Sequence, residues 1–148
     1  MAGAARPAPE RMFVKERGTG MDFELGAFYT RDQVHQTLGG GDRQVFLASK
    51  DGIVIAAFLT DEKNREAPQR IYVGAGVGRI RKAKQLATQP DPIPVFRKGN
   101  KGGSHYDRYE FVGLYACAEY DESEEALAVA QPKCDTPVVG ILRMRQAM

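Results

Sequence analysis

Basic residues gather in one part of this chain, and their number is large against the total charge. Residues 70–101 contain eight Lys or Arg and a single acid, Asp91, which gives the stretch a net charge of +7. The whole chain carries only +2, so the remaining residues carry −5. An asymmetry of this size favours a polyanionic partner. The alternative is a solvated helix face, because amphipathic helices often turn their lysines outward.

Glycines stand at the start of this basic stretch. Gly74, Gly76 and Gly78 separate an expected strand at residues 71–73 from an expected helix at residues 79–89. A glycine turn lets backbone N–H groups approach a ligand, and the dipole of the following helix favours a phosphate there. We therefore expect the turn and its neighbours to hold nucleic-acid phosphates. The residues expected to do so are Gly76, Arg79, Arg81, Lys82, Lys84, Arg97 and Lys98.

The same glycines resemble a dinucleotide-binding turn only superficially. The third glycine comes one residue too early for G-x-G-x-x-G. The place of the acid that binds a ribose is held by Arg97 and Lys98. The sequence therefore disfavours a nucleotide cofactor.

A second pair of candidate ligand-binding residues lies near the N-terminus. Thr30 and Gln33 form a capping-box pattern, which predicts a short helix ending at the glycines from Gly39 onward. Arg31 and His35 are four residues apart, so they share one flank of that helix. His35 is either a partly buried histidine bonded to the backbone or, with Arg31, part of a surface that contacts phosphate or base.

Residue types needed for catalysis or for metal binding do not occur at useful spacing. Cys117 and Cys134 are isolated, and His35 and His105 have no neighbouring metal-ligand pattern. There is no G-x-S-x-G motif, so we expect no enzyme, no metal and no cofactor. An enzyme with His35 or His105 as general base is the less favoured alternative. No apolar run is long enough for a membrane span, and residues 1–20 lack a signal-peptide core, so we expect a cytoplasmic protein.

The expected elements describe one domain of the α+β class. Residues 1–22 are rich in Ala, Pro, Gly and charge and are expected to be a flexible arm, and residues 23–146 to form the domain. The expected strands are 44–48, 53–59, 71–73, 95–96, 107–118 and 136–144, with helices at 31–38, 79–89 and 119–130. About six short strands with two to three helices predict a mixed, mostly antiparallel β-barrel.

Several segments resemble PUA-like (SRA-like) domains, over roughly residues 23–118. The best-known relatives are the sulfur-binding domains of type IV (modification-dependent) restriction endonucleases, which read phosphorothioate-modified DNA. The segments that carry the resemblance are residues 29–35, 38–40, 50–52, 67–76, 93–96 and 109–115.

The resemblance implies a non-catalytic reader of modified duplex DNA in a restriction or defence system, working with a separate nuclease. It adds Tyr29, together with Arg31 and His35, to the DNA-binding residues. Sulfur is larger and less hydrated than oxygen, so an apolar pocket favours it; Ala67, Pro68 and Tyr72 are the expected pocket. Other PUA-like domains bind RNA or modified bases, and both ligands remain alternatives.

Overall fold

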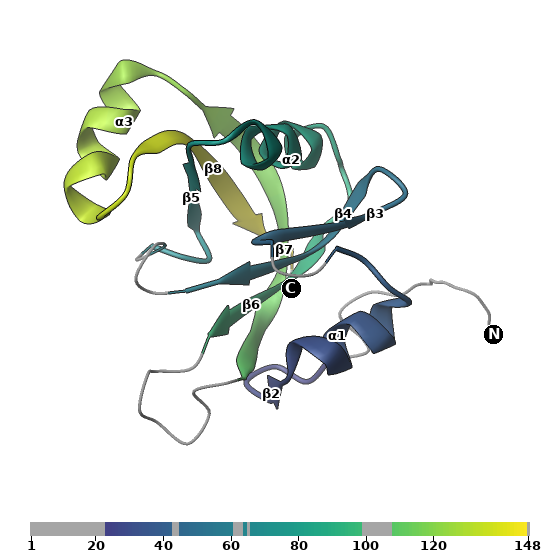
Figure 1. The fold of residues 1–148 in the computed structure, drawn as a ribbon. Helices are drawn as coiled ribbons and strands as arrows, with labels where there is room; N and C mark the ends of the chain where they lie inside the picture. The colour runs from purple at the N-terminus through teal and green to yellow at the C-terminus, as the bar shows by residue number, and fades with distance from the viewer. Residues whose placement is uncertain (1–22, 43–44, 61–63, 65, 99–107, 148) are drawn as a thin grey trace.

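A long strand, β7 (Tyr109–Asp121), runs through the molecule and pairs with three other strands (Figure 1). The computed structural model describes residues 23–42, 45–60, 64, 66–98 and 108–147. Within them the sheet has seven strands, in the order β3-β4-β6-β7-β8-β5, with the short β2 beside β7. The other strands are β2 (Phe28–Tyr29), β3 (Leu47–Lys50), β4 (Ile53–Leu59), β5 (Arg70–Gly74), β6 (Ile93–Lys98) and β8 (Val138–Gln146).

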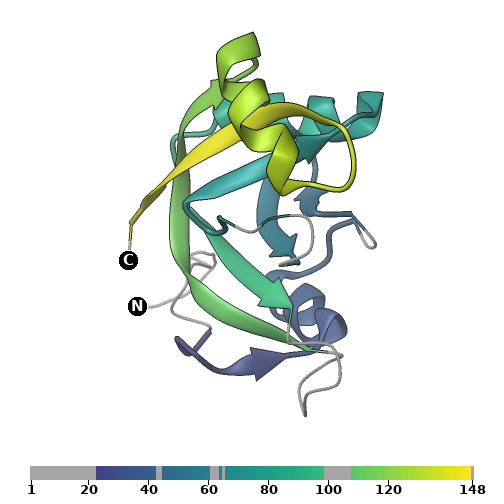
Figure 2. The ribbon, with the colours of Figure 1, turned by 90° about the vertical axis from the view of Figure 1, so that its left-hand side faces the viewer.

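The sheet is mixed and strongly curved. Strands β4 and β6 are parallel, and the other described pairs are antiparallel. Between β6 and β7 the register shifts, and Gly113 of β7 lies there with a φ of +129°, a conformation that favours glycine. A shift of this kind bends the strand and increases the local twist. The sheet therefore curls into the half-barrel that Figure 2 shows from the side.

Helices cover the sheet through small apolar faces. Helix α2 (Val77–Ala87) buries Ala83 and Leu86 completely against the main core. Helix α1 (Arg31–Leu38) buries Val34 among phenylalanines of β4, β6 and β7. Helix α3 (Glu124–Ala130) and the 3-10 turn η2 (Gln131–Lys133) follow β7 and pack near β8. No helix among the described residues is long and apolar enough to cross a membrane.

The predicted α+β fold is confirmed, and several local predictions with it. The capping box forms in full, since Gln33 N donates to Thr30 Oγ1 at 3.2 Å and Thr30 N donates to Gln33 Oε1 at 2.8 Å. The strand predicted at residues 53–59 is β4. The arm predicted at residues 1–22 lies outside the described residues.

The helix predicted from residue 119 was wrong at its start. Residues 119–121 continue β7, because they pair with β8. Helix α3 begins only after Ser123, whose Oγ accepts a hydrogen bond from Ala126 N at 3.2 Å. The acidic composition favoured a helix, but the pairing with β8 decided the structure.

Candidate nucleic-acid interface

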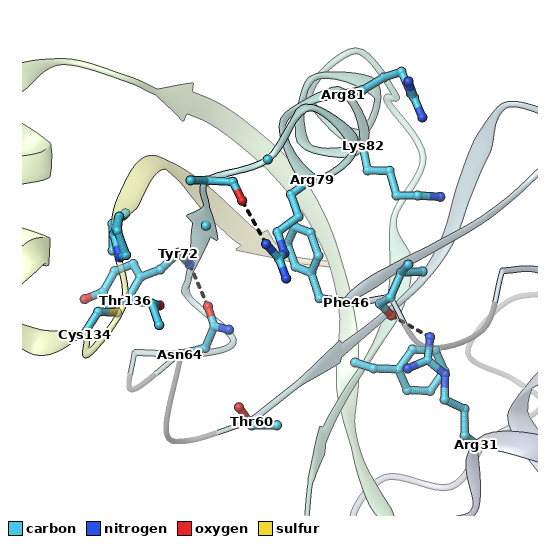
Figure 3. A pocket seen from close by; sticks show the side chains of 18 residues that line it. Arg31, Phe46, Thr60, Asn64, Tyr72, Arg79, Arg81, Lys82, Cys134 and Thr136 are labelled. Atoms are coloured by element: carbon cyan, nitrogen blue, oxygen red, sulfur yellow. Dashed lines mark hydrogen bonds between the residues drawn. The ribbon is translucent and has the colours of Figure 1, made fainter.

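A cleft of about 920 Å³ lies between the β5–α2 connection, the loop after β4 and the start of α1 (Figure 3). Its aromatic lining includes Phe46 and Phe58, and all charged side chains among its described lining residues are Lys or Arg. The polar lining residues are Arg31, Thr60, Asn64, Arg79, Arg81, Lys82 and Thr136. A cationic wall beside a partly exposed aromatic ring is suited to a nucleotide.

The glycine turn forms the upper edge of the cleft in Figure 3. Gly76 has a φ of +136° and is the N-cap of α2, with no side chain capping the first turn. The backbone N–H groups of the first turn of α2 therefore remain available to an anion. Arg79 folds back over the turn, because its Nη1 donates to Ala75 O at 2.8 Å. Arg79 and Arg81 are both exposed, and both line the cleft.

Lys82 faces the cleft, but its ammonium group already binds other side chains of the protein. Its Nζ donates to Ser49 Oγ at 2.6 Å and forms a very short ion pair with Asp42. The hydrogen bond from Lys82 is the main reason that the pKa of Asp42 is lowered from its usual value. The Lys82 side chain is only 14% exposed. It therefore ties α2 to β3 and adds positive potential, and it is a poorer phosphate ligand than Arg79.

Arg31 forms the opposite wall and is held from three sides. Its Nε donates to Nε2 of His35 at 3.2 Å, and its Nη2 donates to Val45 O. Its guanidinium lies 4.0 Å from the centroid of the Phe58 ring, within the range of a cation–π contact. His35 is 2% exposed and its Nδ1 lies 3.0 Å from Gly40 O. His35 thus positions Arg31 and does not itself line the cleft.

The inner end of the cleft contains a buried amide. Asn64 is 6% exposed, and its Oδ1 accepts a hydrogen bond from Tyr72 N at 2.6 Å. The hydroxyl of Tyr72 donates to Glu66, which Lys133 also contacts at 3.1 Å. Burial, followed by the bond to Glu66, raises the pKa of Tyr72 above its usual range. Tyr72 therefore anchors the loop and offers little ring surface to a ligand.

The remaining residues predicted for the site do not line the cleft. Ala67 and Pro68 are buried, and Ala67 belongs to the main core. Tyr29 accepts a hydrogen bond from Glu24 N at 2.8 Å and packs its ring on Phe23.

The other basic residues predicted for the site lie outside the cleft, on α2 and on β6. Lys84 lies two positions after Lys82, which places it on another flank of α2, ~200° around the helix. Arg97 and Lys98 end β6, half-buried, with the Lys98 ammonium 5.8 Å from the Tyr109 ring centroid.

Four of the lining residues belong to no pattern that could be recognised from the sequence: Phe46, Thr60, Asn64 and Thr136. Phe46 precedes β3 and Thr136 precedes β8, and the two are 90 positions apart in the chain. No motif in the sequence includes Thr60 or Asn64. An asparagine among charged residues is an ordinary loop residue, and only the fold shows that Asn64 is buried.

Comparison with known proteins identifies the fold. No protein-family model matches the chain, and no curated protein matches it. Its structure is similar to the SRA domain of SUVH5 in complex with hemi-methylated CG DNA, with a TM-score of 0.55 at 16% identity, covering 84% of this chain and 88% of that one.

Two further solved structures have a similar fold. The SUVH5 SRA domain bound to fully hydroxymethylated CG DNA gives a TM-score of 0.51 at 15% identity, covering 83% of this chain and 88% of that one. The modification-dependent TagI restriction endonuclease gives 0.50 at 20% identity, covering 83% of this chain and 49% of that one. The predicted PUA-like (SRA-like) fold is confirmed.

Proposed function

We propose that this domain is a non-catalytic reader of modified DNA, which holds the modified nucleotide in the cleft. The observation that carries the proposal is the cleft itself, with its volume of about 920 Å³ and its cationic and aromatic lining. Pockets of roughly 300–1,000 Å³ are typical for small organic groups. The solved structures of similar fold include domains in complex with methylated or hydroxymethylated DNA.

Affinity and discrimination would come from different residues. Arg79 and Arg81 are exposed at the edge of the cleft beside the open N-terminus of α2, where they can contact flanking phosphates. Such contacts fix the register on the duplex and carry no information about the modification. Discrimination would come from inside the cleft, where Phe46 offers a half-buried ring for stacking.

The size of the cleft favours a modified base over a phosphorothioate. A single sulfur atom needs only a shallow apolar contact, and the residues expected to provide it, Ala67 and Pro68, are buried. A base would reach the cleft only after leaving the stack, which costs a few kcal/mol and must be repaid by contacts inside. The phosphorothioate remains the alternative among modifications, and structured RNA the alternative among nucleic acids.

We propose binding as the whole activity of the domain. Cleavage in a restriction or defence system would then be the task of a separate nuclease. Among the described residues, no group of three His, Cys, Asp or Glu side chains is placed to hold a metal ion.

A titration by fluorescence anisotropy tests the proposal. The probes are matched duplexes at fixed salt: unmodified, base-modified with 5-methyl or 5-hydroxymethyl pyrimidines, and phosphorothioate in both stereoisomers, with a structured RNA alongside. We expect at least one base-modified duplex to bind ~10-fold or more tightly than the unmodified one. Equal affinity for all DNA duplexes would overturn the proposal. Preference for a phosphorothioate duplex or the RNA would identify that ligand instead.

A reporter and a control variant make the result specific to the cleft. 2-Aminopurine beside the modified base should increase in fluorescence when the base leaves the stack. Arg79→Ala should weaken the binding of every duplex, while Lys84→Ala, on the other flank of the same helix, removes an equal charge outside the cleft and should matter less.

A further inference from the structure

Asn64 has one side of its amide fixed by the protein, and the other side has no hydrogen-bond partner among the residues that the structure describes. Its Oδ1 accepts from Tyr72 N at 2.6 Å. Its own backbone N–H donates to Thr60 O at 2.8 Å, and its carbonyl accepts from Ala67 N at 3.1 Å. Both the main chain and the side chain of Asn64 are therefore held in one position, in the loop before β5 and against Tyr72 of that strand.

These contacts decide which atom faces the cleft. A backbone N–H can only donate, so the side-chain atom opposite Tyr72 N must be the oxygen, and the amide cannot be turned round. Figure 3 shows the nitrogen on the side away from Tyr72, toward the space that Arg79 and Phe46 border. No described residue accepts a hydrogen bond from this nitrogen. A side chain that is 6% exposed thus directs its N–H donors into the cleft.

The other described polar groups of the cleft reinforce this donor character. Arg31, Arg79 and Lys82 can only donate, and Thr60 and Thr136 can donate or accept. No carboxylate occurs among the described lining residues. A ligand with an acceptor opposite Asn64 would satisfy the buried amide, whereas a ligand with an amino group there would leave two donors facing each other.

We propose that the cleft selects a keto base, meaning a modified uracil, thymine or guanine, over a modified cytosine or adenine. This rests on the proposed function, because it assumes that the base enters the cleft. Uracil and thymine carry the acceptor O4 and guanine the acceptor O6, at the position where cytosine and adenine carry an amino donor. Asn64 would then be the residue that determines which class of base is read.

The most direct probes are two duplexes that differ only in whether the modified base carries a keto oxygen or an amino group at position 4. One carries a single 5-hydroxymethyluracil and the other a single 5-hydroxymethylcytosine, each opposite an abasic site so that neither base must be unpaired. We expect wild-type protein to bind the uracil duplex ~10-fold more tightly, the factor that one hydrogen bond in place of a repulsive contact supports. Equal binding, or tighter binding of the cytosine duplex, overturns the inference.

Asn64→Asp is the matched variant. One carboxylate oxygen can still accept from Tyr72 N, while the other replaces the donor in the cleft by an acceptor. The preference should therefore reverse toward the cytosine duplex, and an unchanged preference in a folded Asn64→Asp protein counts against Asn64. Melting temperature reports whether the variant is folded. If it is not, the wild-type comparison alone decides.

The two proposals fail in different ways. If neither hydroxymethyl duplex binds more tightly than the same duplex with an unmodified base, while a phosphorothioate duplex does, the base-reading function and the Asn64 inference both fall. If modified bases are preferred over unmodified ones but the cytosine form binds as well as the uracil form, only the selection by Asn64 falls.

Discussion

Arg31 and His35 are joined by a hydrogen bond that fixes the proton of the histidine. Arg31 Nε donates to His35 Nε2 at 3.2 Å. Arginine has no acceptor, so Nε2 must be the unprotonated nitrogen and Nδ1 must donate to Gly40 O, 3.0 Å away. The ring is also stacked on Phe58, which Arg31 covers with its guanidinium. His35 therefore orients the guanidinium of Arg31 through this hydrogen bond.

His35→Ala should act on DNA binding through Arg31. We expect Arg31→Ala to weaken binding, His35→Ala to weaken it less, and the double variant to bind no worse than Arg31→Ala, with a coupling energy of ~0.5–3 kcal/mol. His35→Ala should also lower the free energy of unfolding by ~1–3 kcal/mol, because it removes a buried, bonded ring. Anisotropy titrations and urea melts of the three variants measure both effects. Additive losses in binding would mean that His35 acts independently of Arg31.

Variants of Arg79 and Arg81, at the edge of the cleft, should affect DNA affinity, whereas a variant of Lys82 should affect stability. Arg79→Ala and Arg81→Ala should each reduce the slope of log K against log salt by ~1, because each removes one phosphate contact. Lys82→Ala should instead lower the melting temperature, since its ammonium is bound to Ser49 and Asp42. Salt titrations in parallel with thermal melts test this division. A salt slope that changes for Lys82→Ala but not for Arg79→Ala would reverse the assignment.

The sequence predicted the elements of this protein better than its site. Local signals were sufficient where one segment decides the outcome, as for the capping box of Thr30 and Gln33.

The cleft depends on contacts between distant segments, which no local pattern records. Phe46, Asn64 and Thr136 meet because β5 pairs with β8 and because β3 lies at the far edge of the same curled sheet. Charge alone likewise could not separate Lys82 from Arg79, because the difference lies in the position of Asp42, forty residues away in sequence.

Low pH should weaken the ion pair between Asp121 of β7 and Arg143 of β8. Arg143 Nη2 lies 2.7 Å from Asp121 Oδ2, and chiefly through this hydrogen bond the pKa of Asp121 falls to about 2. In the unfolded chain an aspartate has a pKa of ~3.9. Because the pKa is lower in the folded protein, the ionised carboxylate stabilises the fold at every pH above the pKa of the unfolded chain. This stabilisation is lost as the pH falls toward the folded pKa. The contribution of Asp121 should therefore be complete above pH ~4 and disappear toward pH ~2.

Thermal melts from pH 6 to pH 2 compare wild type with Asp121→Asn. The variant should be less stable near neutral pH, and its melting temperature should fall less steeply between pH ~4 and ~2. Glu125→Gln is the control, because Glu125 is exposed on α3 and makes no ion pair with another described residue. Parallel curves for wild type and Asp121→Asn would show that this ion pair adds nothing to stability.

Phe46 should provide the stacking surface of the cleft. It is half-buried and lines the cleft, whereas Phe58 is 4% exposed and already covered by Arg31. Stacking of a base on an aromatic ring is worth ~1–3 kcal/mol. Phe46→Ala should therefore weaken binding of the modified duplex ~5- to 150-fold, while binding of unmodified duplex, which rests on Arg79 and Arg81, changes little.

Phe46→Leu and Phe46→Tyr distinguish stacking from simple apolar contact. Leucine keeps much of the packing of Phe46 on the main core but has no π face, so Phe46→Leu should bind the modified duplex nearly as poorly as Phe46→Ala. Phe46→Tyr keeps the ring and should bind close to wild type. Melting temperatures measured beside the titrations show whether the core is intact, since Phe46 packs against it. Full affinity of a folded Phe46→Leu protein for the modified duplex would exclude stacking on this ring.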